Sequence, residues 1–264
     1  MNAIRATIIL LALIAAAFVP AASSAQSDEE AQMGADTFSD LKSQGVIVKS
    51  SPLYDTLRPI AADITRVVQP QYGYPIHFYI VHSNEPNAFA APGGNVYVID
   101  SLMYFVHNRE ELAGTLCHET SHLLHHDSLK EANHDEAIRR REILAQILLG
   151  PSLGTALATD AIGDLDSMHY SREAEESADL TGADNCAKAG LNPWGLVWLF
   201  QEFDSSNMKT PPEFLSDHPG NANRVEALEK HFSENPALFG RFDSDPKHGT
   251  RLNLPKNAAE EFLK

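Results

Sequence analysis

The chain has 264 residues, enough for one sizeable hydrophobic core, and 43% of them are hydrophobic, as is usual for a globular protein. Its 36 acidic residues outnumber the 20 basic ones, which gives a formal net charge of -16. A nucleic-acid-binding surface has to be basic in order to neutralise phosphates. This charge therefore excludes nucleic acid from the expected partners.

The N-terminus has the pattern of a signal peptide, predicted to span residues 1–25. Arg5 gives a short basic start, residues 6–19 form an apolar run, and small residues at 22–25 allow cleavage. The apolar run is shorter than the roughly 20 residues that cross a bilayer, although an uncleaved membrane anchor is the alternative. We therefore expect an exported protein, periplasmic or secreted, in which residues 26–264 form a single domain.

The N-terminal half of that domain predicts a helix followed by two strands. Residues 26–69 are polar at first and then carry apolar residues at helical spacing, so they predict one long helix. Strands are predicted at 76–82 and 95–99, which are rich in β-branched and aromatic residues. A loop is predicted between them, at 83–94.

The C-terminal half is predicted to be helical. Asn108 followed by Glu111 forms a capping box, which predicts a helix from residue 108 to about 127. We expect an α+β fold, mostly helical with a small β-sheet. Further helices are predicted at 135–149, 170–189, from 192 onward and at 221–232, with a buried helical hairpin at 143–159, where a membrane-spanning helix is the alternative.

A His-Glu-x-x-His pattern lies within the predicted capped helix. His118 and His122 are four residues apart, so their imidazoles share one helix face and can bind one metal ion. Glu119 is rotated by about 100° from His118 and lies beside the metal position. A general base that takes a proton from water has to lie there. A core helix that carries two histidines by chance is the alternative.

A catalytic zinc site also needs a third protein ligand and one open position. No third histidine follows at the short spacing of the metzincin pattern, so the ligand is sought on the helix predicted at 170–189, among Glu173, Glu175, Glu176 and Asp179. Glu175 and Asp179 are four residues apart and share a face. If Glu175 binds the metal, Asp179 can accept the ring N–H of a ligand histidine. The alternatives are a surface carboxylate at Glu175 and a structural salt bridge at Asp179.

Together these motifs resemble a known family. His118-Glu119-x-x-His122, followed by Ser171-Arg172-x-x-Glu175-x-x-Ala178-Asp179, resembles the HtpX and CAAX prenyl protease family of gluzincin zinc metalloendopeptidases. The resemblance covers roughly residues 34–231 and is closest to a soluble, periplasmic branch of the family. Further matches are the segment 87–94, His126, and His218-Pro219 with Arg224 downstream.

The resemblance implies a fold and a site. It implies a zincin-like metallopeptidase domain with the sheet beside the active-site helix, one Zn2+ per chain, and Glu175 as the third ligand. It also implies that His218 and Arg224 are catalytic groups that donate to the oxyanion. Because His218 lies on a loop with Pro and Gly, it can instead swing to the open zinc position and keep the enzyme latent. The sequence leaves both roles of His218 open.

The expected substrate is a protein or peptide in an extended conformation. Its backbone is expected to add as a strand along the edge formed by Asn87, Ala88, Phe89 and Ala90. We expect the enzyme to cut peptide bonds within exported, unfolded or misassembled proteins, and membrane-surface or outer-membrane proteins are candidate partners. One alternative is a latent, chaperone-like zinc-binding protein, which the intact Glu119 disfavours. The other is an exopeptidase, for which no terminus-binding motif is present.

The two cysteines, Cys117 and Cys186, are expected to stay free and buried. Cys117 adjoins a metal ligand, whereas Cys186 lies eleven residues beyond Glu175, about 16 Å along a straight helix. A disulfide needs Cα atoms within about 7 Å of each other. On this spacing the two thiols are too far apart to pair.

Overall fold

A four-stranded sheet lies between helices on its two sides. The computed structural model of the chain describes residues 21–132, 170–205, 218 and 221–255. Within them β4 pairs parallel with β2 and antiparallel with β3, so β3 is an edge strand of this sheet. The strands are β1 (Ile47–Val48), β2 (His77–Val81), β3 (Ala88–Ala91) and β4 (Asn95–Ile99), in the order β1-β2-β4-β3.

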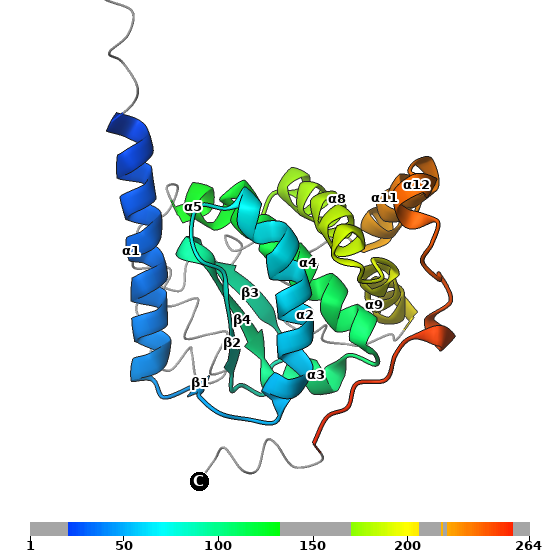
Figure 1. Cartoon of the computed structure of the whole chain (residues 1–264), viewed down its shortest axis with the longest axis horizontal. Helices are drawn as coiled ribbons and strands as arrows, with labels where there is room; N and C mark the ends of the chain where they lie inside the picture. The colour runs from blue at the N-terminus through cyan, green and yellow to red at the C-terminus, as the bar shows by residue number, and fades with distance from the viewer. Residues whose placement is uncertain (1–20, 133–169, 206–217, 219–220, 256–264) are drawn as a thin grey trace, which may run out of the picture.

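The helices form layers around this sheet. Figure 1 shows α1 along one side of the sheet, α2 and α4 on the other side, and α8, α9 and α11 beyond α4. This fold confirms the predicted α+β class, mostly helical with a small sheet. The helices are α1 (Ala21–Ser43), α2 (Leu53–Val68), α3 (Asp100–Phe105), α4 (Arg109–His125), α5 (Asp127–Ala132), α8 (Arg172–Ala189), α9 (Trp194–Ser205), α11 (Asn221–Glu234) and α12 (Pro236–Phe239), with 3-10 turns at Gln69–Gln71, Pro92–Gly94 and Pro246–His248.

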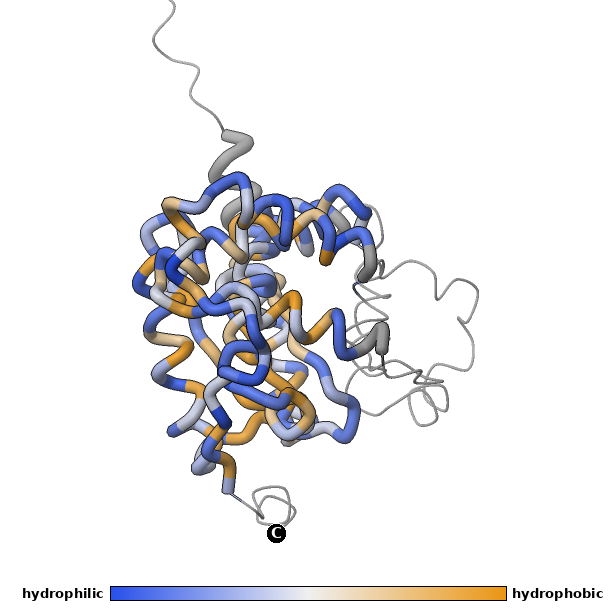
Figure 2. The backbone as a smooth tube through the Cα atoms, turned by 90° about the vertical axis from the view of Figure 1, so that its right-hand side faces the viewer, coloured by the Kyte–Doolittle hydropathy of each residue, from blue (hydrophilic) through white to orange (hydrophobic). Residues whose placement is uncertain are grey.

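The main core lies between the sheet and the helices α2 and α4. Ile60 and Ile64 of α2, Ile80 and Val98 of the sheet and Leu116 of α4 are buried together there. Their spacing on α2 follows the helical period, so that helix buries one face and exposes the other. Figure 2 shows the resulting alternation of hydrophobic and hydrophilic stretches along the helices.

The opposite face of the sheet carries an aromatic row. Tyr97 stacks between Tyr79 and Phe89, with ring centroids 5.7 Å and 5.0 Å away. The α1 residues Phe38 and Leu41 pack against this row. Both faces of the sheet are therefore apolar, which explains why β4 is buried along its whole length.

The prediction of a single helix over residues 26–69 is wrong. The structure has two helices there, α1 and α2, separated by the short strand β1. Gly45 has a φ of 73°, a left-handed conformation that ends the first helix, and Pro52 directly precedes the second. Helical periodicity on both sides of the break concealed it.

The loop predicted for residues 83–94 is also only partly right, because it contains β3. The sequence Ala88-Phe89-Ala90-Ala91 is poor in strand-forming residues and has no polar alternation. Its strand conformation comes from pairing with β4, a contact that local sequence does not encode.

Cys117 and Cys186 are free and buried as expected, but the distance argument was wrong. The helices α4 and α8 run antiparallel, and the Cys186 thiol lies close enough to hydrogen-bond that of Cys117. Burial, followed by this neighbour, raises the pKa of the Cys117 thiol well above its usual value. Gly182 permits the close approach, since a Cβ there would lie 3.0 Å from the Cys117 carbonyl oxygen.

The other predicted elements agree with the structure to within a few residues, except those that fall outside the described residues. The latter are the predicted helix at 135–149, the hairpin at 143–159 and most of the predicted signal peptide. The helix α1 begins at Ala21 and so includes both sides of the predicted cleavage site after Ala25. Among the described helices, none combines the length and the apolar character needed to cross a membrane.

Candidate metal centre

The helix α4 brings two imidazoles together in the interior. Asn108 caps this helix, its side-chain oxygen accepting a hydrogen bond from the backbone N–H of Glu111. Further along the helix, His118 and His122 lie one turn apart, both fully buried, and their Nε2 atoms are 3.0 Å apart. The helical spacing seen in the sequence thus places two nitrogen donors at one point.

Each imidazole has a carboxylate behind it. The Nδ1 atom of His118 lies 2.9 Å from Asp179, and Nδ1 of His122 lies 2.9 Å from Asp127. A ring that donates its Nδ1–H to a carboxylate keeps the Nε2 lone pair free for a metal. Burial favours the protonated form of Asp127, but hydrogen bonds with His122 and His125 outweigh it and hold the pKa of this carboxyl well below its usual range.

Glu175 reaches the same point from the first turn of α8. Its carboxylate oxygens lie 3.5 Å from Nε2 of His118 and 3.6 Å from Nε2 of His122. Burial raises the pKa of Glu175 to about 7, although the Arg224 guanidinium, 3.0 Å away, opposes the rise. The α8 helix begins at the Ser171 cap, whose hydroxyl accepts from the N–H of Ala174.

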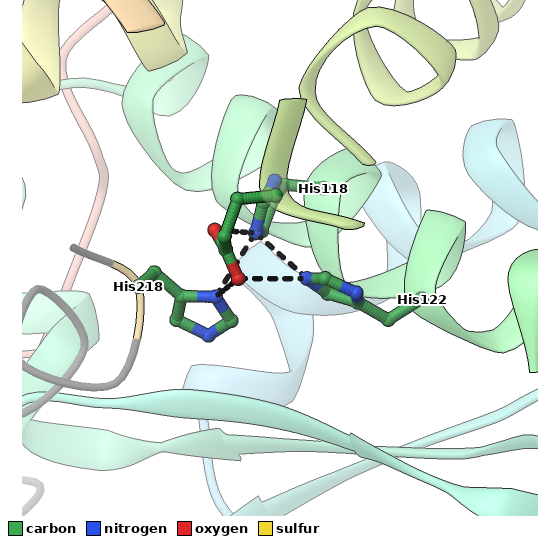
Figure 3. Close-up of side chains that lie close together, drawn as sticks. His118, His122 and His218 are labelled. Carbon is green, nitrogen blue, oxygen red and sulfur yellow. Dashed lines mark hydrogen bonds and ion pairs between the residues drawn. The ribbon is translucent and has the colours of Figure 1, made fainter. Parts of the chain in front are cut away.

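His218 completes the cluster. Its Nδ1 lies 2.7 Å from a Glu175 oxygen and 3.3 Å from Nε2 of His118. Figure 3 shows the three imidazoles converging on one point. The ligand atoms of His118, His122, Glu175 and His218 all lie within 4.8 Å of one another.

This donor set fits a divalent metal such as zinc. Burial, with a smaller contribution from His122, lowers the pKa of His118 well below its usual value, which keeps the imidazole neutral. Burial also lowers the pKa of His122, against the opposing hydrogen bond to Asp127. Neutral imidazoles and one carboxylate in a buried cluster are the ligands that zinc takes in catalytic sites.

Glu119 lies beside the cluster, not among its four ligand atoms. It is buried, and its Oε1 atom is 3.5 Å from Nε2 of His218. One nitrogen of the His218 ring, Nδ1, therefore contacts Glu175, while the other, Nε2, lies near Glu119.

Arg224 lies next to the cluster and holds two groups there in place by hydrogen bonds. Its Nε and Nη2 atoms donate to the two oxygens of Asp179, at 2.6 Å and 2.7 Å, in a bidentate pair. Its Nη1 donates to the backbone carbonyl of His218 at 2.7 Å. The guanidinium also lies over the Phe200 ring, 4.3 Å from the centroid.

The expected substrate edge corresponds to β3 and the residue before it. Asn87 is fully buried, its backbone carbonyl accepts from Ile99, and its side-chain oxygen accepts from the N–H of Ala88. Ala88, Phe89 and Ala90 form the edge strand itself.

Three residues near the centre were missed in the sequence: Asp127, Ser128 and Tyr170. The Tyr170 ring stacks on that of His122, with centroids 4.1 Å apart and planes at 14°. Its hydroxyl lies 2.8 Å from that of Ser128. The position of Asp127 at the predicted end of α4 was the only local signal.

Comparison with known proteins places the chain in a family. Residues 55–231 match Peptidase family M48, and since this is more than half of the chain, the protein belongs to that family. The match confirms the resemblance inferred from the motifs. The chain therefore belongs to a family of metal-dependent peptidases.

Several curated proteins are similar to the chain. The Beta-barrel assembly-enhancing protease of Yersinia pestis is 29% identical over 155 residues, 55% of this chain and 32% of the relative. Metalloendopeptidase OMA1, mitochondrial, of Danio rerio is 26% identical over 233 residues, 81% of this chain and 48% of the relative. Metalloprotease YcaL of Escherichia coli K12 is 28% identical over 162 residues, 59% and 62% respectively. The chain thus spans about a third to two thirds of the length of these relatives.

Proposed function

We propose that the protein is a zinc-dependent endopeptidase, with one zinc per chain bound by His118, His122 and Glu175. The observation that carries this proposal is the convergence of their ligand atoms, with Asp179 and Asp127 behind the two imidazoles. Zinc bound there would lower the pKa of a water molecule and polarise the scissile carbonyl.

The protein groups have distinct roles in this proposal. Glu119 is the general base: it accepts a proton from the attacking water and passes it to the leaving amine. Asp179 and Asp127 fix the tautomers of His118 and His122. Arg224 holds Asp179 in place, and its bidentate pair favours this positioning role over direct donation to an oxyanion.

His218 is proposed to hold the enzyme latent. Its Nδ1 lies among the ligand atoms, where it would take the position that a catalytic site keeps open for water. Displacement of this ring would admit substrate. Donation to the oxyanion from the displaced ring remains the second role for the same residue.

The proposed substrates are exported proteins in unfolded or misassembled states. An extended backbone can pair with β3, which is an edge strand of the described sheet, because a peptide adds to such an edge through main-chain hydrogen bonds. The name of the Yersinia pestis relative refers to β-barrel assembly, which favours outer-membrane proteins as partners. A periplasmic location, with residues 1–25 removed as a signal peptide, is part of this proposal and is testable by N-terminal sequencing of the exported protein.

Digestion of unfolded casein tests the function directly. We expect cleavage inside the chain, loss of cleavage with a chelator, and recovery on adding zinc. The Glu119→Gln variant is the matched control, because it retains the ligands and removes the base. Absence of cleavage by both the wild type and a His218→Ala variant would overturn the proposal.

One other function is favoured by a specific observation. His218 among the ligand atoms is also what a latent, chaperone-like zinc protein with little peptidase activity would have. Such a protein would suppress aggregation of an unfolded client without cutting it, and its His218→Ala variant would stay inactive.

A further inference from the structure

Two consecutive residues at the start of α5 reach in different directions. The carboxylate of Asp127 lies 2.9 Å from Nδ1 of His122, on the metal side. The hydroxyl of Ser128 donates to the backbone carbonyl of Ala90 on β3, at 3.1 Å. His126, with a left-handed φ of 53°, makes the turn between α4 and α5 that allows both contacts.

Tyr170 connects the same two places by a second route, because it contacts both His122 and Ser128. Its ring lies parallel to that of His122, and its hydroxyl lies 2.8 Å from that of Ser128. Because the single O–H of Ser128 is directed at Ala90, the Tyr170 hydroxyl is the donor in this second bond. The result is a closed circuit that runs from His122 through Asp127, Ser128 and Tyr170 back to His122.

The Ala90 carbonyl faces away from β4, toward the side on which no further strand is found among the described residues. In an antiparallel ladder, every second residue exchanges hydrogen bonds with the partner strand, and the residues between direct their N–H and C=O outward. The bond from Ile99 N–H to the Asn87 carbonyl marks the first kind of pair, so Ala88 and Ala90 are of the second kind. Ser128 therefore binds the edge on the side where a peptide strand would add.

We propose that Ser128 and Tyr170 are positioning residues that fix the β3 edge relative to His122. A peptide bonded to β3 would then carry its scissile carbonyl to one place beside the metal centre. A carbonyl oxygen has two lone pairs, so Ala90 can accept from Ser128 and from a substrate N–H together. This inference rests on the proposed function, in which substrate pairs with β3.

Ser128 and Tyr170 are expected to affect kcat, not the affinity for the peptide. The peptide bonds with the main chain of β3, which neither residue supplies, while a misplacement of about 1 Å can cost 10²-fold in rate. A hydrogen bond contributes roughly 0.5–1.5 kcal/mol, which corresponds to about 2- to 13-fold. Loss of the link is thus expected to lower kcat by about tenfold.

The test uses zinc-loaded full-length protein and a quenched fluorogenic peptide of extended, unfolded sequence. Tyr170→Phe keeps the stacked ring and removes the hydroxyl, and Ser128→Ala removes both hydrogen bonds. We expect each to lower kcat by about tenfold with KM within twofold, the double variant to fall no further, and Ser128→Thr to restore the rate. Tyr104→Phe and Ser233→Ala are matched controls away from the site, since Tyr104 donates to Pro255 and Ser233 to its own helix.

Two readouts do not depend on turnover. Zinc affinity, from competition with a chromophoric chelator, should be unchanged in Tyr170→Phe and Ser128→Ala because Asp127 and the ring stack remain. Affinity of the labelled peptide, measured by anisotropy in the Glu119→Gln background, should also be unchanged. An unaltered kcat, an effect on peptide affinity alone, or additive losses in the double variant would overturn the positioning role. Absence of cleavage by both the wild type and the His218→Ala variant would overturn the proposed function as well, which separates the two failures.

Discussion

The Arg224 guanidinium and the Asp179 carboxylate form a buried two-point pair, in which Nε and Nη2 each donate to one oxygen. The same carboxylate lies 2.9 Å from Nδ1 of His118. A single side chain therefore connects the positive group behind the site with a ring whose other nitrogen faces the metal position. Removing either member of the pair should therefore change the affinity of the site for the metal.

The first prediction concerns Asp179. The Asp179→Asn variant keeps the size of the side chain but cannot hold the His118 tautomer as firmly. We expect zinc affinity to fall by about 10–100-fold with the fold intact, measured by chelator competition and circular dichroism. Asp184→Asn, which changes a partly exposed carboxylate of the same helix that contacts His231, is the control. An unchanged affinity would reduce Asp179 to a structural partner of Arg224.

The second prediction concerns Arg224. Its loss leaves the Asp179 and Glu175 carboxylates buried without their counter-ion, so Arg224→Ala should destabilise the metal-free protein by about 3–5 kcal/mol. Urea unfolding measures this. Arg58→Ala, which removes an exposed pair with Asp55, should cost less than about 1 kcal/mol. An equal loss of unfolding free energy in the two variants would contradict the role of Arg224 in neutralising the buried carboxylates.

The third prediction concerns the metal. Zinc that binds only the folded state should stabilise it by about 2.7 kcal/mol at a free concentration near 100 times Kd. We expect one zinc per chain by elemental analysis and a rise in Tm when zinc is added to the chelated protein. His122→Ala should show neither. Full zinc content in that variant would remove His122 from the ligand set.

The fourth prediction concerns the base. Glu119→Gln should retain zinc and the fold, and its peptide hydrolysis should fall by at least about 10²-fold, because the general base is lost. Single-turnover assays with saturating enzyme separate this effect from weaker binding. Cleavage near the wild-type rate would exclude Glu119 from proton transfer.

The parts of the site that could be predicted from sequence are those fixed by helical geometry. A four-residue spacing on one helix places His118 beside His122, and the same spacing places Asp179 one turn from Glu175. The Asn108 cap and the Gly190 end of α8 are likewise local signals, and the structure has both. Such relationships hold within a single element, whatever packs against it.

The parts that could not be predicted depend on contacts between elements. Asp127 is five residues after His122, which on a continuous helix would turn it about 140° away. The left-handed turn at His126 brings it back. Tyr170 and Ser128 come from separate segments, and the pairing of β3 depends on β4. Cys117 and Cys186 meet because α4 and α8 run antiparallel, a relationship that spacing along one helix cannot contain.

The last prediction concerns His218, whose two proposed roles lead to opposite results. Its Nδ1 lies 2.7 Å from Glu175 and 3.3 Å from the Nε2 of His118. A residue that only donates to the oxyanion does not need to lie this close to the ligand atoms before substrate binds. A neutral imidazole there competes with water for the metal. We therefore expect His218→Ala to cleave casein faster than the wild type at equal zinc loading. His248→Ala, which changes an exposed histidine paired with Asp243, should leave the rate unchanged. A fall of about 10²–10³-fold in kcat would instead assign His218 to the oxyanion, and an unchanged rate would exclude both roles.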